Sequence, residues 1–518
     1  MCHIAIAILF VTLTAATAEN EFYISSSGDD GNDGRSPQRS WATLEKASSV
    51  TYTAGARILL HRRSAFNGAL VIKGAKGTSN APVVIDCFGT GIALPEINSA
   101  GYSAGVSIEE CAYLEVKNLD IVSDGGKALD KPAKKERFGI YISKSGNVSL
   151  EGIRIHNVFA TVQTESEGKD GTTAYGHGVR FDDSDNVSIA NCVIGRVGRY
   201  GINGKSSRHI KILNNATEHT GCSGLQMGSC TNALVKGNVF NHPGSVIDER
   251  MHGRGSGSWV WGCENILYDR NRFLNARGKA DSCGVHIDFN CKNVVIQHCF
   301  SMNNEGGFIE ILGNNHNCAY RYNISVNDGF RKKGIGGARQ DGKVFWLSGY
   351  CGQKPRSGPF NSYIYNNTFY VKNDKQARFS ISPSTRGALV VNNIFHLTGG
   401  TSVVAGDQRK YKNARTKASG VVFRNNVYVD NGLLPPDLKT SDCDPIVGDA
   451  GFRKPGGNKP GDYRPSNVRL IKDRGVKITK LPEDDIGIAI GMDVKEDFFG
   501  NPIKGKPDIG AIEFIVSE

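Results

Sequence analysis

Short apolar segments alternate with turns rich in Asn, Asp and Gly along most of the chain, and apolar and polar residues alternate inside the segments. Successive side chains of a β-strand point to opposite sides, so this period predicts strands with one buried and one outward face. It places His286 and Asp288 outward in residues 284–289, and Glu310 outward between two isoleucines in residues 306–312. We therefore expect an all-β fold with polar chemistry on its strand faces.

A longer repeat accompanies this alternation. A small residue or Asn followed by an aliphatic residue recurs at intervals of 23 to 44 residues, at Asn118, Gly152, Cys192, Asn215, Asn238, Asn271, Cys299, Asn323, Asn367, Asn393 and Asn426. The shortest interval is typical of one coil of a parallel β-helix, and the longer intervals add an inserted loop. We predict about eleven coils in which the side chains of Asn215, Asn238 and Asn271 stack.

The two ends of the chain follow other patterns. Residues 1–18 contain an apolar run and a small-residue site ending at Ala18, which predicts a signal peptide cleaved there and a secreted or periplasmic protein. No other segment is apolar for long enough to insert into a membrane. We expect the β-helix, including an N-terminal helical cap, over residues 19–440, and a loop-rich C-terminal cap over residues 441–518.

Composition narrows the possible partners. The 518 residues carry a formal net charge of +11 without a Lys/Arg block, which fits either a solvated surface or an acidic polymer partner. Nucleic acid is not expected, because no basic recognition motif accompanies the charge, and we expect a monomer. The 13 cysteines show no spacing typical of a zinc site, so no metal is predicted; Cys222/Cys230 and Cys283/Cys291 are closely spaced pairs that could form disulfides after export.

Three long stretches carry a family resemblance: FYISSSGDDGNDGRSPQRSWATLEKA, the repeated NN-aliphatic-Phe segments, and DFFGNPIKGKPDIGAIEF. They resemble the secreted proteins of the pectate-lyase-like superfamily over almost the whole mature chain. The resemblance implies a right-handed parallel β-helix that acts on polysaccharides, as a hydrolase or as a lyase. It assigns no catalytic residue to this sequence by motif.

The candidate catalytic residues are Asp288, Glu310 and His286. Pairing Gly306 with Gly284 puts Asp288 and Glu310 side by side on adjacent coils, about 4.8 Å apart. Two such carboxyl groups can serve as the acid and the nucleophile or base of a glycosidase, and their repulsion raises one pKa. The alternative is that either carboxylate only pairs with an arginine.

A second set of polar and aromatic residues suits substrate binding. Arginine holds carboxylate or sulfate groups in a bidentate way, and tryptophan offers an apolar platform for a sugar ring. The same side chains could equally anchor loops or fill the core. The candidates are Arg180 and Asp182 on an earlier coil, and Arg250, His252, Arg254 and Trp261 in residues 244–263.

Three functions remain open. The first is a secreted glycoside hydrolase that cleaves a polysaccharide, expected to be acidic, by carboxylate acid/base chemistry without a cofactor. The second is a polysaccharide lyase or epimerase acting on a uronic acid polymer, where Ca²⁺ could assist. The third is a glycan-binding surface protein without catalysis. The ionisable groups gathered in a few adjacent coils favour an enzyme.

Overall fold

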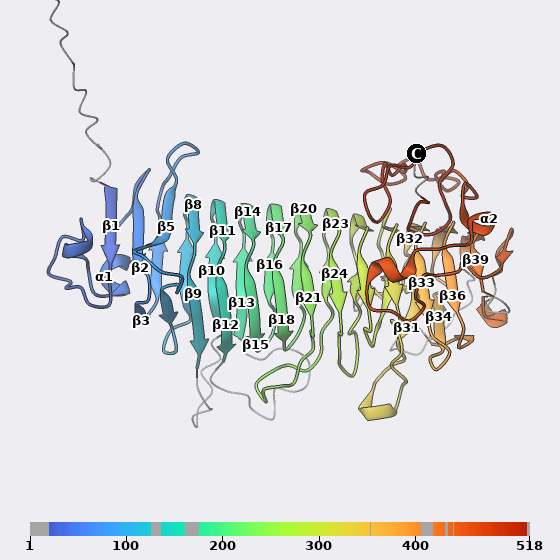
Figure 1. The fold of residues 1–518 in the computed structure, drawn as a ribbon, viewed down its shortest axis with the longest axis horizontal. Coiled ribbons are helices and arrows are strands. Elements are labelled where there is room, and N and C mark those ends of the chain that lie inside the picture. The colour runs from blue at the N-terminus through green and yellow to red at the C-terminus, as the bar shows by residue number, and fades with distance from the viewer. Residues whose placement is uncertain are drawn as a thin grey trace, which may run out of the picture.

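The chain folds into a long rod of three parallel β-sheets, which Figure 1 shows from its side. This computed structural model describes residues 20–125, 136–160, 176–352, 354–405, 418–429, 434–438 and 440–514. The expected signal peptide and its cleavage site after Ala18 lie outside these residues. No helix within the described ranges is long and apolar enough to cross a membrane. The predicted all-β parallel β-helix is confirmed.

Sheet A has 14 strands, and every neighbouring pair is parallel. In order they are β1 (Glu21–Ile24), β2 (Arg57–His61), β5 (Val83–Phe88), β8 (Ala112–Lys117), β11 (Gly146–Glu151), β14 (Asp185–Ala190), β17 (Arg208–Leu213), β20 (Thr231–Lys236), β23 (Glu264–Asp269), β26 (Lys292–Gln297), β29 (Ala319–Arg321), β32 (Phe360–Tyr365), β35 (Arg386–Val391) and β38 (Ser419–Arg424).

Sheet B also has 14 strands and follows sheet A in each coil. In order they are β3 (Ala65–Asn67), β6 (Glu96–Asn98), β9 (Asp120–Asp124), β12 (Arg154–Phe159), β15 (Val193–Val197), β18 (Ala216–Thr220), β21 (Val239–Asn241), β24 (Arg272–Leu274), β27 (Phe300–Met302), β30 (Ile324–Val326), β33 (Thr368–Val371), β36 (Ile394–Leu397), β39 (Val427–Tyr428) and β40 (Ile446–Val447).

Sheet C has 12 strands. From the N-terminal end they are β4 (Leu70–Lys73), β7 (Ala104–Glu109), β10 (Arg137–Ser143), β13 (Gly176–Asp182), β16 (Ile202–Lys205), β19 (Leu225–Gly228), β22 (Ser258–Trp261), β25 (Val285–Ile287), β28 (Gly307–Ile311), β31 (Lys343–Leu347), β34 (Ala377–Ile381) and β37 (Thr401–Val403). Every residue of β25, β28 and β31 is buried, so neighbouring loops cover the outer face of these three strands.

A buried asparagine ladder joins sheet A to sheet B. The Nδ2 of Asn215 donates to Oδ1 of Asn238 at 3.0 Å, and that of Asn238 donates to Oδ1 of Asn271 at 2.9 Å. Cys299 takes the next position, where its Sγ accepts from the backbone N–H of Asn271 at 3.4 Å. The predicted stacking of the three asparagines is therefore confirmed, and the amide chain satisfies polar groups inside the rod.

At the N-terminal end of this ladder the sequence alignment is one residue early. Asn118 and Gly152 hold the left-handed backbone that precedes the ladder position on each coil, with φ of 54° and 63°. The ladder position itself is Leu119 and then Ile153, whose carbonyls bond to the next coils just as that of Cys192 does. Left-handed backbone favours Asn and Gly, so the sequence signal marks the bend and not the stacked side chain.

A column of glycines forms the turn from sheet B to sheet C. At Gly178 a Cβ atom would lie 2.4 Å from the carbonyl oxygen of Gly201 and from Cγ2 of Ile194. At Gly201 it would lie 2.6 Å from the carbonyl oxygen of Gly224. Only a residue without a side chain allows this approach, which explains the glycines at these positions.

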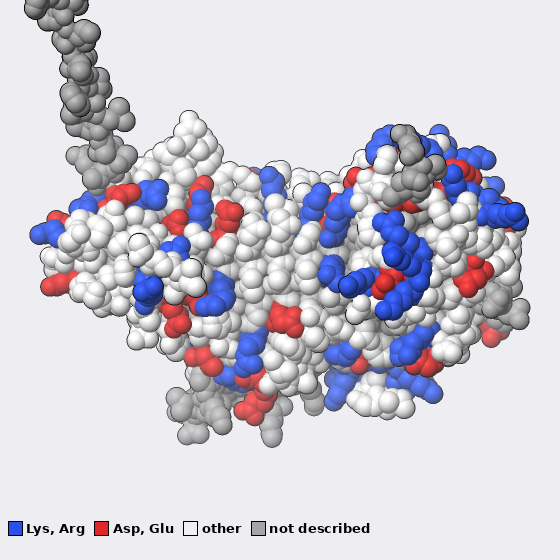
Figure 2. Space-filling model, viewed as in Figure 1, with Lys and Arg blue, Asp and Glu red and all other residues white. Residues whose placement is uncertain are grey.

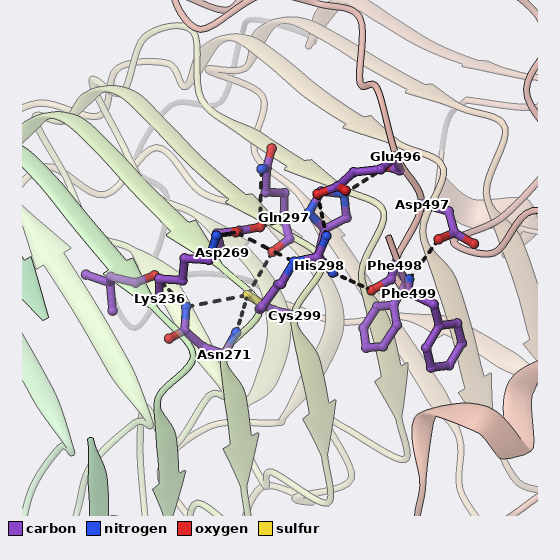
Figure 3. Close-up of polar contacts among 12 residues, drawn as sticks. Lys236, Asp269, Asn271, Gln297, His298, Cys299, Glu496, Asp497, Phe498 and Phe499 are labelled. Atoms are coloured by element: carbon purple, nitrogen blue, oxygen red, sulfur yellow. Dashed lines mark hydrogen bonds and ion pairs between the residues drawn. The ribbon is translucent and has the colours of Figure 1, made fainter. Parts of the chain in front are cut away.

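Both ends of the rod carry additional structure. At the N-terminal end, helix α1 (Leu44–Ser48) buries Leu44 and Ala47 in the main core. The C-terminal region contains the short helix α2 (Val468–Ile471) and runs back along the rod, where Glu496 forms an ion pair with Arg270 and the Phe498 carbonyl oxygen accepts a hydrogen bond from Arg270. Figure 3 shows Glu496 of this region beside His298 of the rod. The segment expected as a second end cap thus also covers the side of coils far earlier in the sequence. The described residues also contain the short 3₁₀ helices η2 (Pro37–Arg39), η4 (Ile335–Gly337), η5 (Pro436–Leu438) and η6 (Pro460–Tyr463).

Candidate active site

One column of outward residues crosses sheet C and contains three of the candidate residues, Arg180, His286 and Glu310. Paired residues on successive strands are Arg180, Asn203, Gln226, Trp259 and His286, and beyond these Glu310 pairs with Trp346. The aliphatic neighbours of each of these residues point into the core, as the alternation predicts. The column therefore presents polar and aromatic groups along the outer face of one sheet.

The register between β25 and β28 differs from the expected one. Cys283 pairs with Gly307 and Ile287 with Ile311, so partners are 24 positions apart and not 22. Glu310 is thus level with His286, and the predicted side-by-side placement of Asp288 and Glu310 is wrong. Both offsets are even, so Glu310 keeps the outward direction that the alternation gave it.

Glu310 is held in a buried polar contact. Its Oε2 lies 2.7 Å from Sγ of Cys283, and both residues are buried. Burial and the charge of Glu310 raise the pKa of the Cys283 thiol well above its usual value, so the thiol stays protonated and donates to the carboxylate. Glu310 therefore has a fixed partner within the protein.

Lys343 is a buried amine beside this pair. Burial lowers its pKa to about 8, although the charge of Glu310 favours the protonated form. Its Nζ donates to the carbonyl oxygen of Asp341 at 2.9 Å and lies 3.9 Å from the centre of the Trp346 ring. The indole N–H of Trp346 is buried and has no hydrogen-bond partner among the described residues. The site thus contains an amine that can release a proton near neutral pH.

His286 is fixed by a ring stack and by a hydrogen-bond contact. Its ring stacks on Trp259 with centroids 5.7 Å apart and an angle of 10°, and its Nδ1 lies 3.2 Å from Oγ of Ser256. The Nε1 of Trp259 in turn donates to Oγ of Ser223 at 3.1 Å. A network of hydroxyl groups below the column therefore orients the imidazole and its tryptophan neighbour.

Asp281 is a functional candidate that the sequence analysis did not select. It precedes β25 and holds a left-handed backbone with φ of 50°, as does Ser282 with 64°. The Nε of Arg254 donates to Oδ2 of Asp281 at 2.8 Å. Burial raises the pKa of Asp281, but the charges of Arg254 and His286 outweigh it and hold the pKa below its usual value. Asp281 is therefore a carboxylate at neutral pH.

Asp288 lies directly after β25 and has the opposite shift. Burial, together with the charges of Asp281 and Glu310, raises its pKa to about 7. The charge of His286 and a hydrogen bond from the Phe289 N–H partly offset this rise. A large fraction of Asp288 is therefore protonated near neutral pH. One segment of eight residues thus holds an ionised carboxylate at its start and a protonated carboxyl group at its end.

Two further predicted residues lie in the loop that leads from β21 to β22. Arg254 contacts the site through Asp281, as described above. His252 is electrostatically coupled to Arg254 and Asp281, and burial together with neighbouring arginines lowers its pKa to about 4. One sequence signal could have identified Asp281. It is the single carboxylate in residues 275–284, the loop before β25, and could therefore pair with Arg254 of the preceding loop.

The remaining predicted binding residues have structural contacts of their own. Arg250 forms ion pairs with Asp124 and Asp248, and its guanidinium lies 4.1 Å from the Phe159 ring centre. The Trp261 ring packs on Phe289 with centroids 6.3 Å apart. Because Val260 pairs with Ile287, the next residue, Trp261, is level with Asp288. Trp261 lies near the site, whereas Arg250 anchors its loop.

Arg180 and Asp182 are far from Asp281 and Asp288. They bond to each other, with Nε to Oδ2 at 2.9 Å, and Arg180 also faces Glu136 at 3.5 Å. The sheet order β13, β16, β19, β22, β25 places four strand steps between Arg180 and His286, or about 19 Å. They share the face of the site but not its centre.

Two groups of side chains among the described residues could hold a metal ion. They are Cys283, His286 and Glu310 in the site, and Glu218, His219 and His242 on sheet B; in each group the ligand atoms lie within 4.8 Å of one another. Each group has one carboxylate, whereas Ca²⁺ takes six or more oxygen ligands. Thiolate and imidazole ligands suit Zn²⁺ better.

Fold and site together define a parallel β-helix protein with an acid–base cluster on one sheet. Residues 67–242 and 177–369, more than half of the chain together, match the family described as the right handed beta helix region, and the chain belongs to this family.

The chain is similar to a lacto-N-biosidase of Bifidobacterium longum subsp. longum, with 25% identity over 97% of this chain and 37% of that protein. It thus spans little more than a third of that relative. Among solved structures it resembles the GH136 lacto-N-biosidase of Eubacterium ramulus, with a TM-score of 0.51, 18% identity, and coverage of 83% of this chain and 68% of the other. Pectate lyase Pel9A shares 13% identity at a TM-score of 0.43, covering 95% of this chain and 96% of that one.

Proposed function

We propose that the protein is a glycoside hydrolase that cleaves a glycan with Asp288 as the general acid and Asp281 as its carboxylate partner. The observation that carries this proposal is the pair of opposite pKa shifts in one segment. Burial raises the pKa of Asp288 to about 7, while Arg254 and His286 hold that of Asp281 below its usual range. Acid catalysis of glycoside cleavage needs this combination of a protonated and an ionised carboxyl group.

Each residue has a defined role in this reaction. Asp288 donates its proton to the glycosidic oxygen as the bond to the anomeric carbon breaks, and the leaving alcohol departs neutral. The Asp281 carboxylate stabilises the developing positive charge and either attacks the anomeric carbon or removes a proton from the attacking water. Arg254 keeps Asp281 ionised. His286 and Glu310 line the column beside the reacting groups, as positioned ligands for the sugar.

The similarity to lacto-N-biosidases makes a lacto-N-biosyl glycoside the first substrate to test. An acidic polysaccharide is the second, because Lys343 and Arg331 contribute positive charge next to Glu310. Arg331 donates to the carbonyl oxygens of Gly278 and Asp281 at 3.0 and 2.9 Å, which places it at the edge of the site.

The product distinguishes hydrolysis from its alternatives. The purified chain is incubated with a lacto-N-biosyl aryl glycoside and with pectate, alginate and sulfated polysaccharides, while reducing ends and ultraviolet absorbance are followed. For the wild type we expect new reducing ends without a rise in ultraviolet absorbance. For Asp288→Asn we expect no new reducing ends. Binding without cleavage of any substrate would instead identify a glycan-binding protein.

One observation favours elimination as a second candidate function. Lys343 has a pKa of about 8 because it is buried, so its neutral amine could remove the C5 proton of a uronate. A lyase would leave an unsaturated product that absorbs in the ultraviolet. It would also depend on Lys343 and not on Asp281, so that Lys343→Met abolishes activity and Asp281→Asn leaves it intact.

A further inference from the structure

We propose that Glu218, His219 and His242 form a Zn²⁺ site on sheet B, separate from the acid–base cluster on sheet C. Nδ1 of His242 lies 2.8 Å from Oε1 of Glu218, and Nε2 of His219 lies 3.3 Å from the same oxygen. Ligand atoms bound tetrahedrally at 2.0–2.1 Å from zinc are separated by about 3.3 Å. Two imidazoles and one carboxylate are a common zinc ligand set, with a fourth position left for water.

The groups around these three residues leave the metal-binding atoms available. Asn241 donates to Oε2 of Glu218 at 2.8 Å, which orients the carboxylate and leaves Oε1 toward both imidazoles. Nδ1 of His219 lies 3.2 Å from Oγ of Ser245, which fixes the ring so that Nε2 can bind. Such outer partners are typical of histidines that bind metal. All three residues are partly exposed, so an ion can enter.

The two histidines interrupt a column where asparagine is the usual residue. The left-handed residues at this end of successive sheet B strands are Asn157, Arg196, His219, His242, Asn275, Asn303 and Asn327. Two imidazoles on consecutive coils stack with centroids 4.7 Å apart and an angle of 9°. Arg196, the cation of the preceding coil, donates from Nε to Oδ1 of Asn157 at 2.8 Å.

The position of the site suggests what the metal stabilises. His242 directly follows β21 and begins the loop to β22, and this loop carries Arg254, which binds Asp281. The backbone N–H of Ser245 in the same loop donates to the Thr220 carbonyl at 2.9 Å. A metal bound by His219 and His242 would join two coils to the start of the loop that supports the acid–base cluster.

Zinc binding by the full chain tests this proposal. The protein is freed of metal by a chelator, and Zn²⁺ is titrated in competition with a chromophoric chelator. We expect a site of one Zn²⁺ per chain whose affinity falls tenfold or more in His219→Asn, His242→Asn and Glu218→Gln. Asparagine fits the left-handed backbone at both histidine positions, so these variants should fold. Cobalt(II) should give the visible spectrum of a tetrahedral complex in the wild type and lose it in the variants.

Two control variants make the result specific. His209→Asn changes an exposed left-handed histidine that lies 2.7 Å from Asp185 but has no second imidazole, and it should leave zinc binding unchanged. Cys283→Ser removes a ligand from the cluster on sheet C. The proposal is overturned if the wild type binds no zinc, if the sheet B variants bind it like the wild type, or if Cys283→Ser alone removes the site.

Discussion

The asparagine ladder consists of buried amides, whereas Asp281 and Asp288 are partly exposed carboxyl groups, and the two sets differ in how their polar atoms are satisfied. Around Asn238 each ladder amide donates to the same residue type on the next coil, at 2.9 to 3.0 Å. In the segment from Asp281 to Asp288 each carboxyl group meets a different neighbour, Arg254 for Asp281 and the Phe289 N–H for Asp288. The repeated amide contacts stabilise the rod, whereas the unequal contacts of Asp281 and Asp288 give these two carboxyl groups different pKa values.

The backbone shows the same contrast. Strands β20 and β23, which lead to Asn238 and Asn271 of the ladder, pair at five residues, whereas β25 and β28 share only one pair of strand residues, with Gly307 at a φ of 141° beside them. Loops of ten or more residues precede β22, β25 and β31 in the sequence. The contrast predicts that changes in the ladder affect folding and changes in the segment affect catalysis.

The largest expected effect is on turnover. Asp281→Asn and Asp288→Asn should each lower kcat by about a hundredfold or more, because each removes one of the two groups that act on the glycosidic bond. Steady-state kinetics measures the loss, and chemical denaturation should show an unfolding midpoint close to that of the wild type. Activity at wild-type level in either variant would contradict the assigned pair.

The ladder should respond in the opposite way. Asn238→Ala leaves the Asn215 N–H and the Ile212 carbonyl without their partners and should lower the free energy of unfolding by about 2–4 kcal/mol. Denaturant titration measures it, and kcat per folded molecule should not change. Asn265→Gly, which removes an exposed amide with φ of 58°, is the matched control and should cost under about 1 kcal/mol.

Arg254 connects the loop to the segment. Arg254→Gln removes the charge that holds the pKa of Asp281 down, so that pKa should rise and the acidic limb of kcat/KM should move to higher pH. We expect about a tenfold loss of activity at pH 5. Arg250→Gln, whose guanidinium pairs with Asp124 and Asp248, should leave the acidic limb in place.

The basic limb of the pH profile should report Asp288. Its pKa of about 7 means that the required proton is lost as pH rises, so kcat/KM should fall about tenfold per pH unit above that value. Profiles measured from pH 4 to 10 check this. If the basic limb persists in the residual activity of Asp288→Asn, it belongs to another group. Lys343, whose pKa is about 8, is then the first group to examine.

The smallest effect is expected at Arg180. Because it lies about 19 Å from His286, Arg180→Gln should change kcat by less than about twofold, and any loss should appear as a higher KM for long substrates only. Comparing a disaccharide glycoside with a polymer measures this difference. A large fall in kcat would instead extend the catalytic site across the intervening coils.

The sequence by itself determined the repeating features of this protein. Alternation identified the outward face of β25 and β28, and the Asn repeat identified the coils, because both depend on local backbone geometry that every coil shares. His286, Asp288 and Glu310 were therefore placed on the correct face. Glycine and asparagine positions marked the bends for the same reason.

Only the tertiary structure decided which of these residues meet. The offset of 24 between β25 and β28 put Glu310 beside His286 and Cys283, and a loop from an earlier coil brought Arg254 to Asp281. An even offset of 22 or 24 gives the same alternation, so the pattern could not distinguish them. Acidity depends on burial and on charges contributed by distant segments, and these exist only once the coils and their loops are packed together.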